Sequence, residues 1–198
     1  MAQDELQKLI NLISRLPGIG QRSAQRIALY LIKNKQELMS PLGESIKETA
    51  AKVRKCEICG MLDVNLPTKI CSSDTRIKNI ICIVEDMADV WAFERSGFYK
   101  GQYHVIGGLL SASKNFTEQD LRLHKLKERI EKNKVEEIIL ALSATIEGQT
   151  TALVIRDYLE KMNLKITQLA YGVPVGSEIH YLDENTLGAA LESRKNLS

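Results

Sequence analysis

The sequence has few cysteines and prolines, little aromatic content and no long uninterrupted run of apolar residues. A membrane-spanning helix needs about 20 mostly apolar residues, so we expect no transmembrane segment. The start, Met1 to Glu5, lacks the positive charge and apolar stretch of a secretory signal. Of 198 residues, 4 are cysteines. They would form a poor disulfide framework and are better candidates for metal ligands. We therefore expect a cytoplasmic protein.

The composition, with 44% hydrophobic and 26% charged residues, is that of an ordinary globular chain with one large domain or a core domain and an appendage. The net charge of +2 conceals an asymmetry. Residues 1–55 hold 10 Lys and Arg against 5 Asp and Glu, whereas residues 56–198 hold 17 against 20. A polyanion bound by the first segment explains this imbalance, and a solvated helix face explains it equally well.

Apolar residues recur at helical spacing through residues 1–55. The pattern predicts a helix that ends near Leu16, a second from Ser23 to about Ile32, and a third that ends near Lys55. Pro41 and Gly43 are expected to separate the last two helices. In residues 56–79 the composition shifts to include Gly, Asn, Pro, Ser and cysteine, which interrupt any periodic pattern and predict a small knuckle without long regular structure.

The rest of the chain predicts an α/β fold, because apolar runs alternate with helical segments. Residues 80–84 are continuously apolar, which is typical of a parallel strand buried on both faces. Further strands are expected at residues 103–106, 138–142 and 165–170, with helices near residues 86–96, 117–133 and 148–162.

The segment Leu16-Pro17-Gly18-Ile19-Gly20 lies between two amphipathic helices and predicts an abrupt hairpin with exposed backbone amides. Such amides, with the positive end of the following helix, bind phosphate regardless of base sequence. Arg22 and Arg26 share one helix face beside the hairpin, where they can neutralise phosphates. A helix C-cap followed by solvated arginines would explain Pro-Gly alone. The combination of Gly18, Gly20, Arg22 and Arg26 favours a DNA-binding helix-hairpin-helix.

Three cysteines predict a metal site. Cys56-x-x-Cys59 suits two corners of a tetrahedral zinc site, and Cys71 can supply a third. Thr68 stands where a second Cys-x-x-Cys pair ending at Cys71 would begin, so the fourth ligand is missing. Two alternatives remain open at this point: a metal-free knuckle held by packing, or a shell completed by Asp63 or Asp74.

Glu85 and Asp86 follow the strand at residues 80–84, at the end where α/β sheets place functional groups. A magnesium site would need further carboxylates from another strand end. The segment Ser143 to Gly148 contains no Asp-x-Asp pair and offers only Glu147. Metal-assisted cleavage is therefore disfavoured, and the two acids are expected to cap the next helix and present an acidic surface for a protein partner.

Taken in order, these motifs resemble the RecR family of bacterial recombination mediators. Three further segments carry the resemblance: Ile106-Gly107-Gly108, Thr145-Ile146-Glu147-Gly148 and Tyr171-Gly172-Val173-Pro174-Val175-Gly176. The resemblance implies four parts: a helix-hairpin-helix at 1–55, a four-cysteine zinc-finger-like knuckle at 56–71, a Rossmann-like Toprim domain with a mostly parallel sheet at 79–174, and a C-terminal assembly segment at 175–198. Thr68 departs from the family's third zinc cysteine.

The resemblance also implies a function without catalysis. Family members are similar in forming ring-shaped homotetramers around DNA and in acting with RecO, and often RecF, to load RecA at gapped or single-stranded DNA. Arg22 and Arg26 then fall in the DNA-contacting hairpin, and Glu85 and Asp86 in the acidic patch that contacts partners. Zinc is the implied metal. Two alternatives are a magnesium-dependent Toprim nuclease or primase that uses Glu85, and a pure protein adaptor.

Overall fold

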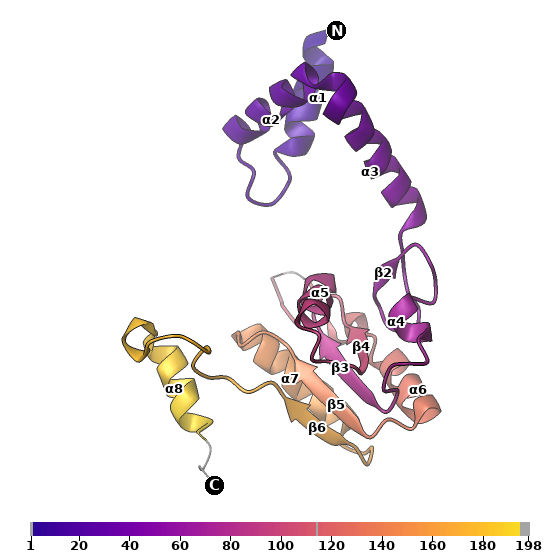
Figure 1. Ribbon diagram of the computed structural model, residues 1–198, viewed down its shortest axis with the longest axis vertical. Helices are drawn as coiled ribbons and strands as arrows, with labels where there is room; N and C mark the ends of the chain where they lie inside the picture. Colours follow the sequence, from indigo (N-terminus) through magenta and orange to yellow (C-terminus); the bar gives the residue numbers. More distant parts are fainter. Residues whose placement is uncertain (1, 114, 195–198) are drawn as a thin grey trace. The chain divides into compact units, whose positions relative to one another are not determined.

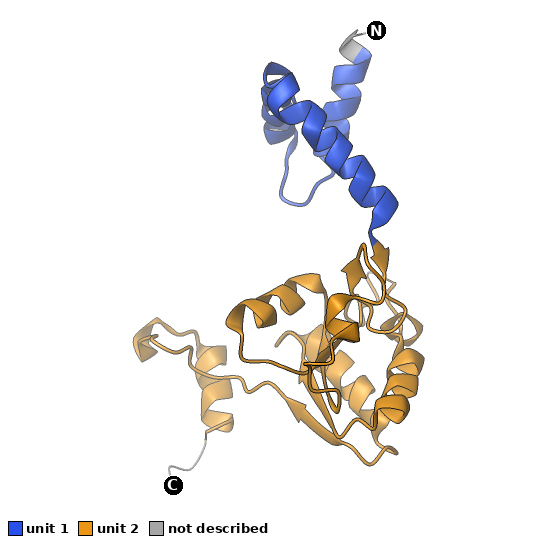
Figure 2. Cartoon of the chain, turned by 45° about the vertical axis from the view of Figure 1, so that its right-hand side comes forward, with its two compact units in different colours: residues 1–53 blue, residues 54–198 orange. Residues whose placement is uncertain are grey.

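The computed structural model describes residues 2–113 and 115–194. The chain divides into two compact units, Met1–Val53 and Arg54–Ser198 (Figure 2). No helix in the described part of the chain is both long enough and apolar enough to cross a membrane.

The first unit is helical and has its own small core. It contains α1 (Ala2–Ile13), α2 (Gln21–Lys33), a π-helical segment η1 (Lys35–Met39) and α3 (Ser40–Lys52). The two alanines of α2 are fully buried, and their small side chains let the α1 and α2 backbones approach closely. The buried residues of this core are Ile10, Ile13, Ala24, Ala28 and Leu31.

Two expectations for this unit are wrong. Regular helix in α1 ends at Ile13 instead of Leu16, and the Leu16 amide donates to the Ile13 carbonyl (3.1 Å) in a turn after the helix. Pro41 and Gly43 do not separate two helices, since both lie inside α3. Pro41 is tolerated there because it occupies the first turn, where a backbone N–H has no helical acceptor.

The second unit is built on a parallel sheet of four strands, which confirms the α/β prediction. The strand order is β4-β3-β5-β6 and every pair is parallel. The strands are β3 (Ile80–Val84), β4 (Gln102–Val105), β5 (Glu137–Ala141) and β6 (Lys165–Gln168). Each expected run coincides with a strand, although β4 and β5 begin one residue early and β6 ends at Gln168.

Helices cover both faces of this sheet (Figure 1). On one face, Ile81 and Ile83 belong to a core with residues of α6 (Leu123–Asn133) and α7 (Ile146–Leu159). On the other face, Cys82 and Val84 share a core with Val90 of α5 (Met87–Ser96). Residues that alternate along β3 therefore enter different cores, as expected for a strand buried on both sides.

The prediction of one helix over residues 117–133 is wrong. A 3₁₀ turn, η2 (Glu118–Leu121), comes first, and α6 starts only at Leu123. Arg122 separates them because its backbone is left-handed, with φ 57°. α7 begins two residues before the expected position, since the Thr145 hydroxyl accepts a hydrogen bond from the Gly148 amide (3.2 Å) and caps it.

The knuckle lies along the free edge of the sheet. It contains β1 (Arg54–Lys55), β2 (Leu62–Asp63) and the short helix α4 (Lys69–Ser72), with β1 and β2 antiparallel. The Val105 amide of edge strand β4 donates to the Cys59 carbonyl (2.7 Å). Gly60 has φ +80°, and a Cβ there would lie 2.2 Å from the Val105 carbonyl oxygen. Only glycine allows this approach, which covers an otherwise exposed strand edge.

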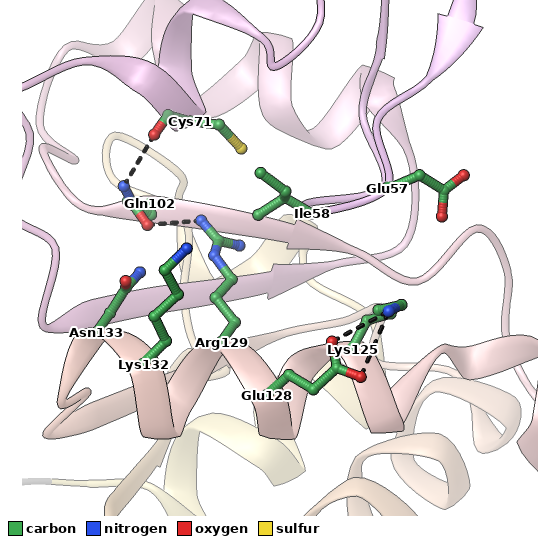
Figure 3. A pocket seen from close by; sticks show the side chains of 9 residues that line it. All are labelled: Glu57, Ile58, Cys71, Gln102, Lys125, Glu128, Arg129, Lys132 and Asn133. Atoms are coloured by element: carbon green, nitrogen blue, oxygen red, sulfur yellow. Dashed lines mark hydrogen bonds and ion pairs between the residues drawn. The ribbon is translucent and has the colours of Figure 1, made fainter.

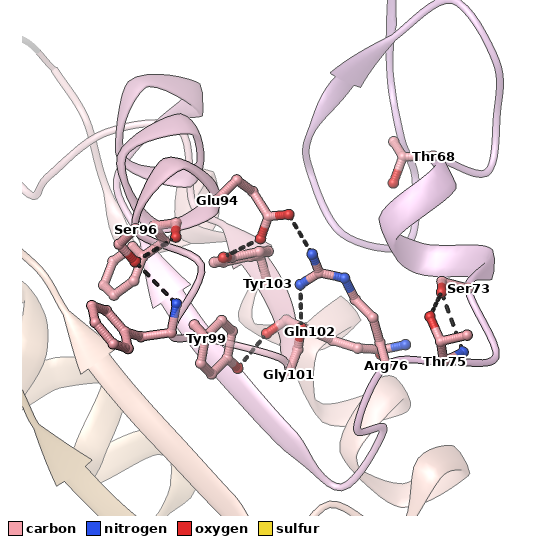
Figure 4. A network of polar contacts seen from close by, with 12 residues as sticks. Thr68, Ser73, Thr75, Arg76, Glu94, Ser96, Tyr99, Gly101, Gln102 and Tyr103 are labelled. Carbon is pink, nitrogen blue, oxygen red and sulfur yellow. Dashed lines mark hydrogen bonds and ion pairs between the residues drawn. The ribbon is translucent and has the colours of Figure 1, made fainter.

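A network of polar contacts fixes the segment that follows the knuckle (Figure 4). Arg76 forms an ion pair with Glu94 of α5 and donates to the Gly101 carbonyl (2.8 Å). The Tyr103 hydroxyl donates to the same carboxylate (2.6 Å). Because one carboxylate joins α5, β4 and the segment after α4, these elements are held at fixed positions around the sheet edge.

After β6, the chain runs through a 3₁₀ turn, η3 (Ile179–Tyr181), to the last helix, α8 (Glu184–Glu192). Asp183 caps α8 by accepting a hydrogen bond from the Thr186 amide (3.0 Å). Several large apolar side chains between β6 and the end of α8 are exposed to solvent. They are Val173, Val175, Ile179, Tyr181 and Leu191.

Candidate nucleic-acid interface and metal centre

The hairpin between α1 and α2 exposes its backbone. Gly18 has φ +74°, a conformation that L side chains rarely adopt, and Gly20 is the N-cap of α2. A Cβ built on either glycine meets no atom within 4 Å, so both glycines lie beside open space. No side chain caps α2, and its first turn holds no acidic residue. The first amides of α2 are therefore available to an anion.

Arg22 and Arg26 lie one turn apart on α2, and both are exposed. Within the described part of the chain neither guanidinium makes a hydrogen bond or an ion pair. Arg26 borders a shallow hollow together with Ile27 and Tyr30. The structure thus brings Gly18, Gly20 and both arginines together in one hairpin unit, with the cations unneutralised.

Sequence reasoning missed one cation of this unit. Arg15 comes directly before the hairpin, is exposed, and its side chain makes no ion pair with a described residue. Counting cations on both sides of the Pro-Gly turn, instead of only after it, would have found Arg15. Exposed cations therefore stand on both sides of the Pro-Gly turn in the sequence.

The three cysteines expected to bind metal come together in the second unit. The sulfur atoms of Cys56, Cys59 and Cys71 all lie within 4.8 Å of one another. Cys56 and Cys59 are buried, and Cys71 is half-buried. The Cys56 amide donates to the Met61 carbonyl (2.7 Å), which closes the turn that carries the first two cysteines. Three thiols at this separation are a donor set that suits zinc.

Thr68 occupies the place beside this cluster. Its side chain is only 3% exposed, and its hydroxyl lies 3.7 Å from the Cys59 sulfur. The same hydroxyl accepts a hydrogen bond from the Cys71 amide (3.2 Å) and caps α4. A hydroxyl thus stands where a fourth thiolate would be needed, and it also has a structural role.

The alternative in which an aspartate completes the shell is wrong for the described side chains, since no carboxylate joins the cluster. Asp74 instead pairs with Lys78 (2.7 Å). Asp63 accepts a hydrogen bond from the Asn65 amide (3.1 Å). The possible metal ligands in this part of the chain are therefore the three thiols.

The pKa values of the Cys59 and Cys71 thiols are shifted in opposite directions. A hydrogen bond to Cys71, followed by burial, raises the pKa of the Cys59 thiol. The same hydrogen bond lowers the pKa of Cys71, and the nearby Arg129 charge adds to this effect. Cys71 is therefore the thiol of this pair that is most readily a thiolate, which is the form that binds metal.

We expect Thr68→Cys to create a four-thiolate site and to raise the zinc affinity by roughly tenfold or more. The reason is that the substitution replaces a buried hydroxyl beside the cluster by a thiolate, which is a stronger zinc ligand. Native mass spectrometry after dialysis against a chelator would report bound zinc per subunit. Thr68→Ser, which keeps the hydroxyl, serves as the control and should retain no more zinc than the parent chain. Equal zinc in all three proteins would contradict the assignment.

Of the two acids after β3 that were expected to cap a helix, Asp86 does so with its carboxylate, whereas Glu85 takes part through its backbone amide. The Asp86 carboxylate accepts from the Ala88 amide (2.7 Å), and the Asp89 carboxylate accepts from the amides of Glu85 and Asp86 (3.1 Å each). This reciprocal arrangement is a capping box at the start of α5. No cluster of three or more carboxylates placed to hold a metal ion is formed by the described side chains.

Models of known families match this chain in three consecutive segments. Residues 6–50 match the RecR helix-hairpin-helix, residues 79–170 the Toprim domain, and residues 172–195 the RecR C-terminal segment. The fold and these matches define a recombination protein that joins a helix-hairpin-helix unit to a Toprim domain.

Relatives along the full chain identify the family. The Recombination protein RecR of Rhodospirillum rubrum is 50% identical over 195 residues, which cover 98% of this chain and 99% of the relative. The proteins of the same name from Maricaulis maris and Hyphomonas neptunium are each 47% identical over 196 residues, or 99% of this chain and 98% of theirs. The chain belongs to the RecR family, and this membership supports a role in recombination and repair.

Proposed function

We propose that this protein is a non-catalytic DNA clamp that promotes recombinational repair. The observation that carries the proposal is the hairpin of the first unit, with open backbone at Gly18 and Gly20 and with Arg22 and Arg26, whose guanidinium groups pair with no described residue. Amides and arginines of this kind contact the sugar-phosphate backbone and do not read bases. Binding is therefore expected to be independent of DNA sequence.

Several copies of the chain act together in this proposal. One hairpin with two arginines binds weakly, but linked copies raise the effective concentration and hold DNA through avidity. Exposed apolar side chains in both units support assembly, among them Tyr30 of α2 and Tyr181 of η3. Two different self-complementary contacts close a tetramer, so we propose a ring-shaped homotetramer, with residues 175–198 as an assembly segment. The subunit count from native mass spectrometry tests this state.

The clamp would act with RecO and RecF to load RecA at gapped or single-stranded DNA in the cytoplasm. Glu85 and Asp86 are the proposed partner contacts, and exposure of Asp86 supports this role. Since the Asp86 carboxylate also caps α5, substitution of Glu85 is the cleaner probe of partner binding. Zinc at Cys56, Cys59 and Cys71 would have a structural role at the sheet edge.

The test of the proposal is a salt-dependent titration with labelled single-stranded DNA. For a clamp that neutralises phosphates, the logarithm of the association constant should fall linearly with the logarithm of the salt concentration. The slope should be about −0.7 for each phosphate contacted on single-stranded DNA. Two arginines in each of several subunits predict a slope steeper than about −3. A protein adaptor without a DNA contact would show no saturable binding at low salt, and that result would overturn the proposal.

A further inference from the structure

A cavity of about 310 Å³ lies between the knuckle and α6 of the second unit (Figure 3). Its walls combine four charged residues of α6 with the side chain of Gln102 from β4 and with Cys71 from α4 of the knuckle. The lining residues are Glu57, Ile58, Cys71, Gln102, Lys125, Glu128, Arg129, Lys132 and Asn133. The volume is at the low end for sites that bind small ligands.

Arg129 carries a buried charge into this cavity. The residue is 5% exposed, and its guanidinium reaches from α6 toward β4. It donates to the Tyr103 carbonyl and to the amide oxygen of Gln102 (2.6 Å), both of which are neutral acceptors. Among the described residues, its Nε has no hydrogen-bond partner and no carboxylate lies within ion-pair distance of the guanidinium. A buried charge in this state is strongly stabilised by an anion.

The acids around the cavity are paired with other cations. Glu128 pairs with Lys125 (3.0 Å), and Glu57 pairs with Arg122 (3.5 Å). Lys132, one turn beyond Arg129, makes no hydrogen bond or ion pair with any described residue. A thiolate at Cys71 would balance one positive charge at most. At least one cation therefore remains for a ligand.

We propose that this cavity binds a phosphate group through Arg129 and Lys132. A guanidinium forms directional hydrogen bonds with phosphate oxygens, and an ammonium adds a second charge, which suits a dianion better than a single carboxylate. Asn133 places a neutral amide at the same rim. The phosphate comes either from a small molecule such as a nucleotide or from a nucleic-acid backbone. This site does not depend on the DNA contacts proposed for the hairpin.

The first experiment measures melting temperature as inorganic phosphate is added, against sodium chloride at matched ionic strength. A ligand that binds only the folded state raises the melting temperature in a saturable way. We expect Lys132→Gln to weaken phosphate binding about tenfold, which corresponds to loss of about one charge-assisted contact. Lys127→Gln removes an exposed α6 lysine that does not line the cavity and should leave phosphate binding unchanged.

Arg129→Gln is a second variant, and it should abolish phosphate binding if the chain stays folded. Since Arg129 also supports β4, Lys132→Gln remains decisive if that variant unfolds. The proposal is overturned if phosphate produces no more stabilisation than chloride, or if Lys132→Gln binds phosphate as tightly as the parent chain.

A second experiment identifies the source of the phosphate. ATP and a short single-stranded oligonucleotide are titrated separately into the double variant Arg22→Glu with Arg26→Glu, in which the hairpin contacts are removed. Sensitivity of oligonucleotide binding to Lys132→Gln would assign the cavity to a nucleic-acid backbone. If ATP and inorganic phosphate bind but the oligonucleotide does not, and if Lys132→Gln weakens their binding, the cavity would be assigned to a small ligand. If Lys132→Gln changes the binding of neither ATP nor the oligonucleotide, the proposed site is wrong, independently of the result for the hairpin arginines.

Discussion

Reversing the charge of both hairpin arginines is expected to remove DNA binding. Arg22→Glu with Arg26→Glu replaces two cations by two anions beside the exposed amides, so attraction to phosphate becomes repulsion. We expect single-stranded DNA affinity to fall at least a hundredfold, roughly, because each subunit of an assembly loses its contacts and the avidity disappears with them. A gel-shift titration at fixed salt measures the change.

A matched control separates position from net charge. Lys47→Glu with Lys52→Glu makes the same change in charge on α3 of the same unit, where each lysine pairs with a glutamate one turn away. This control should lose much less affinity. Arg22 and Arg26 are exposed and bond to no described residue, so the melting temperature should stay the same. An equal loss of affinity in both double variants would show that the hairpin is not the contact.

Acid is expected to destabilise the second unit through His104. This side chain is fully buried in β4, and neither ring nitrogen has a hydrogen-bond partner in the part of the chain that the structure describes. Burial, with the nearby charges of Arg129, Arg122 and Lys55, lowers the pKa of His104 from 6.5 to about 3. The folded state therefore keeps the ring neutral while the unfolded chain takes up a proton below about pH 6.5.

The direction of the pH effect follows from this difference. Because the unfolded state binds more protons between the two pKa values, stability is fully present above about pH 6.5 and falls as the pH drops. The expected loss of unfolding free energy between pH 7 and pH 5 is about 2 kcal/mol from this one group. Urea unfolding at the two pH values, with the same ionic strength, measures it.

His104→Leu should remove most of this pH dependence, because leucine does not titrate and fits a buried strand position. His180→Gln is the control, because His180 is exposed and is not among the groups that lower the pKa of His104; this variant should lose as much stability toward pH 5 as the parent chain. Comparing variants under identical conditions cancels the contributions of carboxylates and thiols. If His104→Leu loses as much stability toward pH 5 as the parent chain, the ring is not the group that titrates.

The sequence predicted the elements whose signals are local. The run at residues 80–84 is apolar because β3 is covered on both faces, and a strand of this kind can be recognised without knowing its neighbours. Asp86 was expected at a helix start, and its capping box is made within four residues. Pro41 misled the prediction because proline breaks a helix interior but fits its first turn. Which of the two applies depends on where the helix begins.

Part of the metal centre could also be read from the chain. Cys56 and Cys59 are close in sequence, so their spacing alone predicts a shared site. The position of Cys71 next to them, and the absence of Asp63 and Asp74 from the cluster, depend on how α4 folds back toward the turn. The hydroxyl of Thr68 fills the remaining place because it caps that same helix.

Amino-acid order by itself determined the helical N-terminal unit, the α/β class, the glycine hairpin with its two arginines, and the pair of cysteines in one turn. Each rests on residues within a few positions of one another, where backbone preference and side-chain periodicity act directly. Tertiary structure alone decided that the pKa of His104 is lowered, that buried Arg129 pairs with no described carboxylate, and that the knuckle covers the edge of β4. These properties come from burial and from charges distant in sequence, and both arise only when the sheet, α6 and the knuckle pack together.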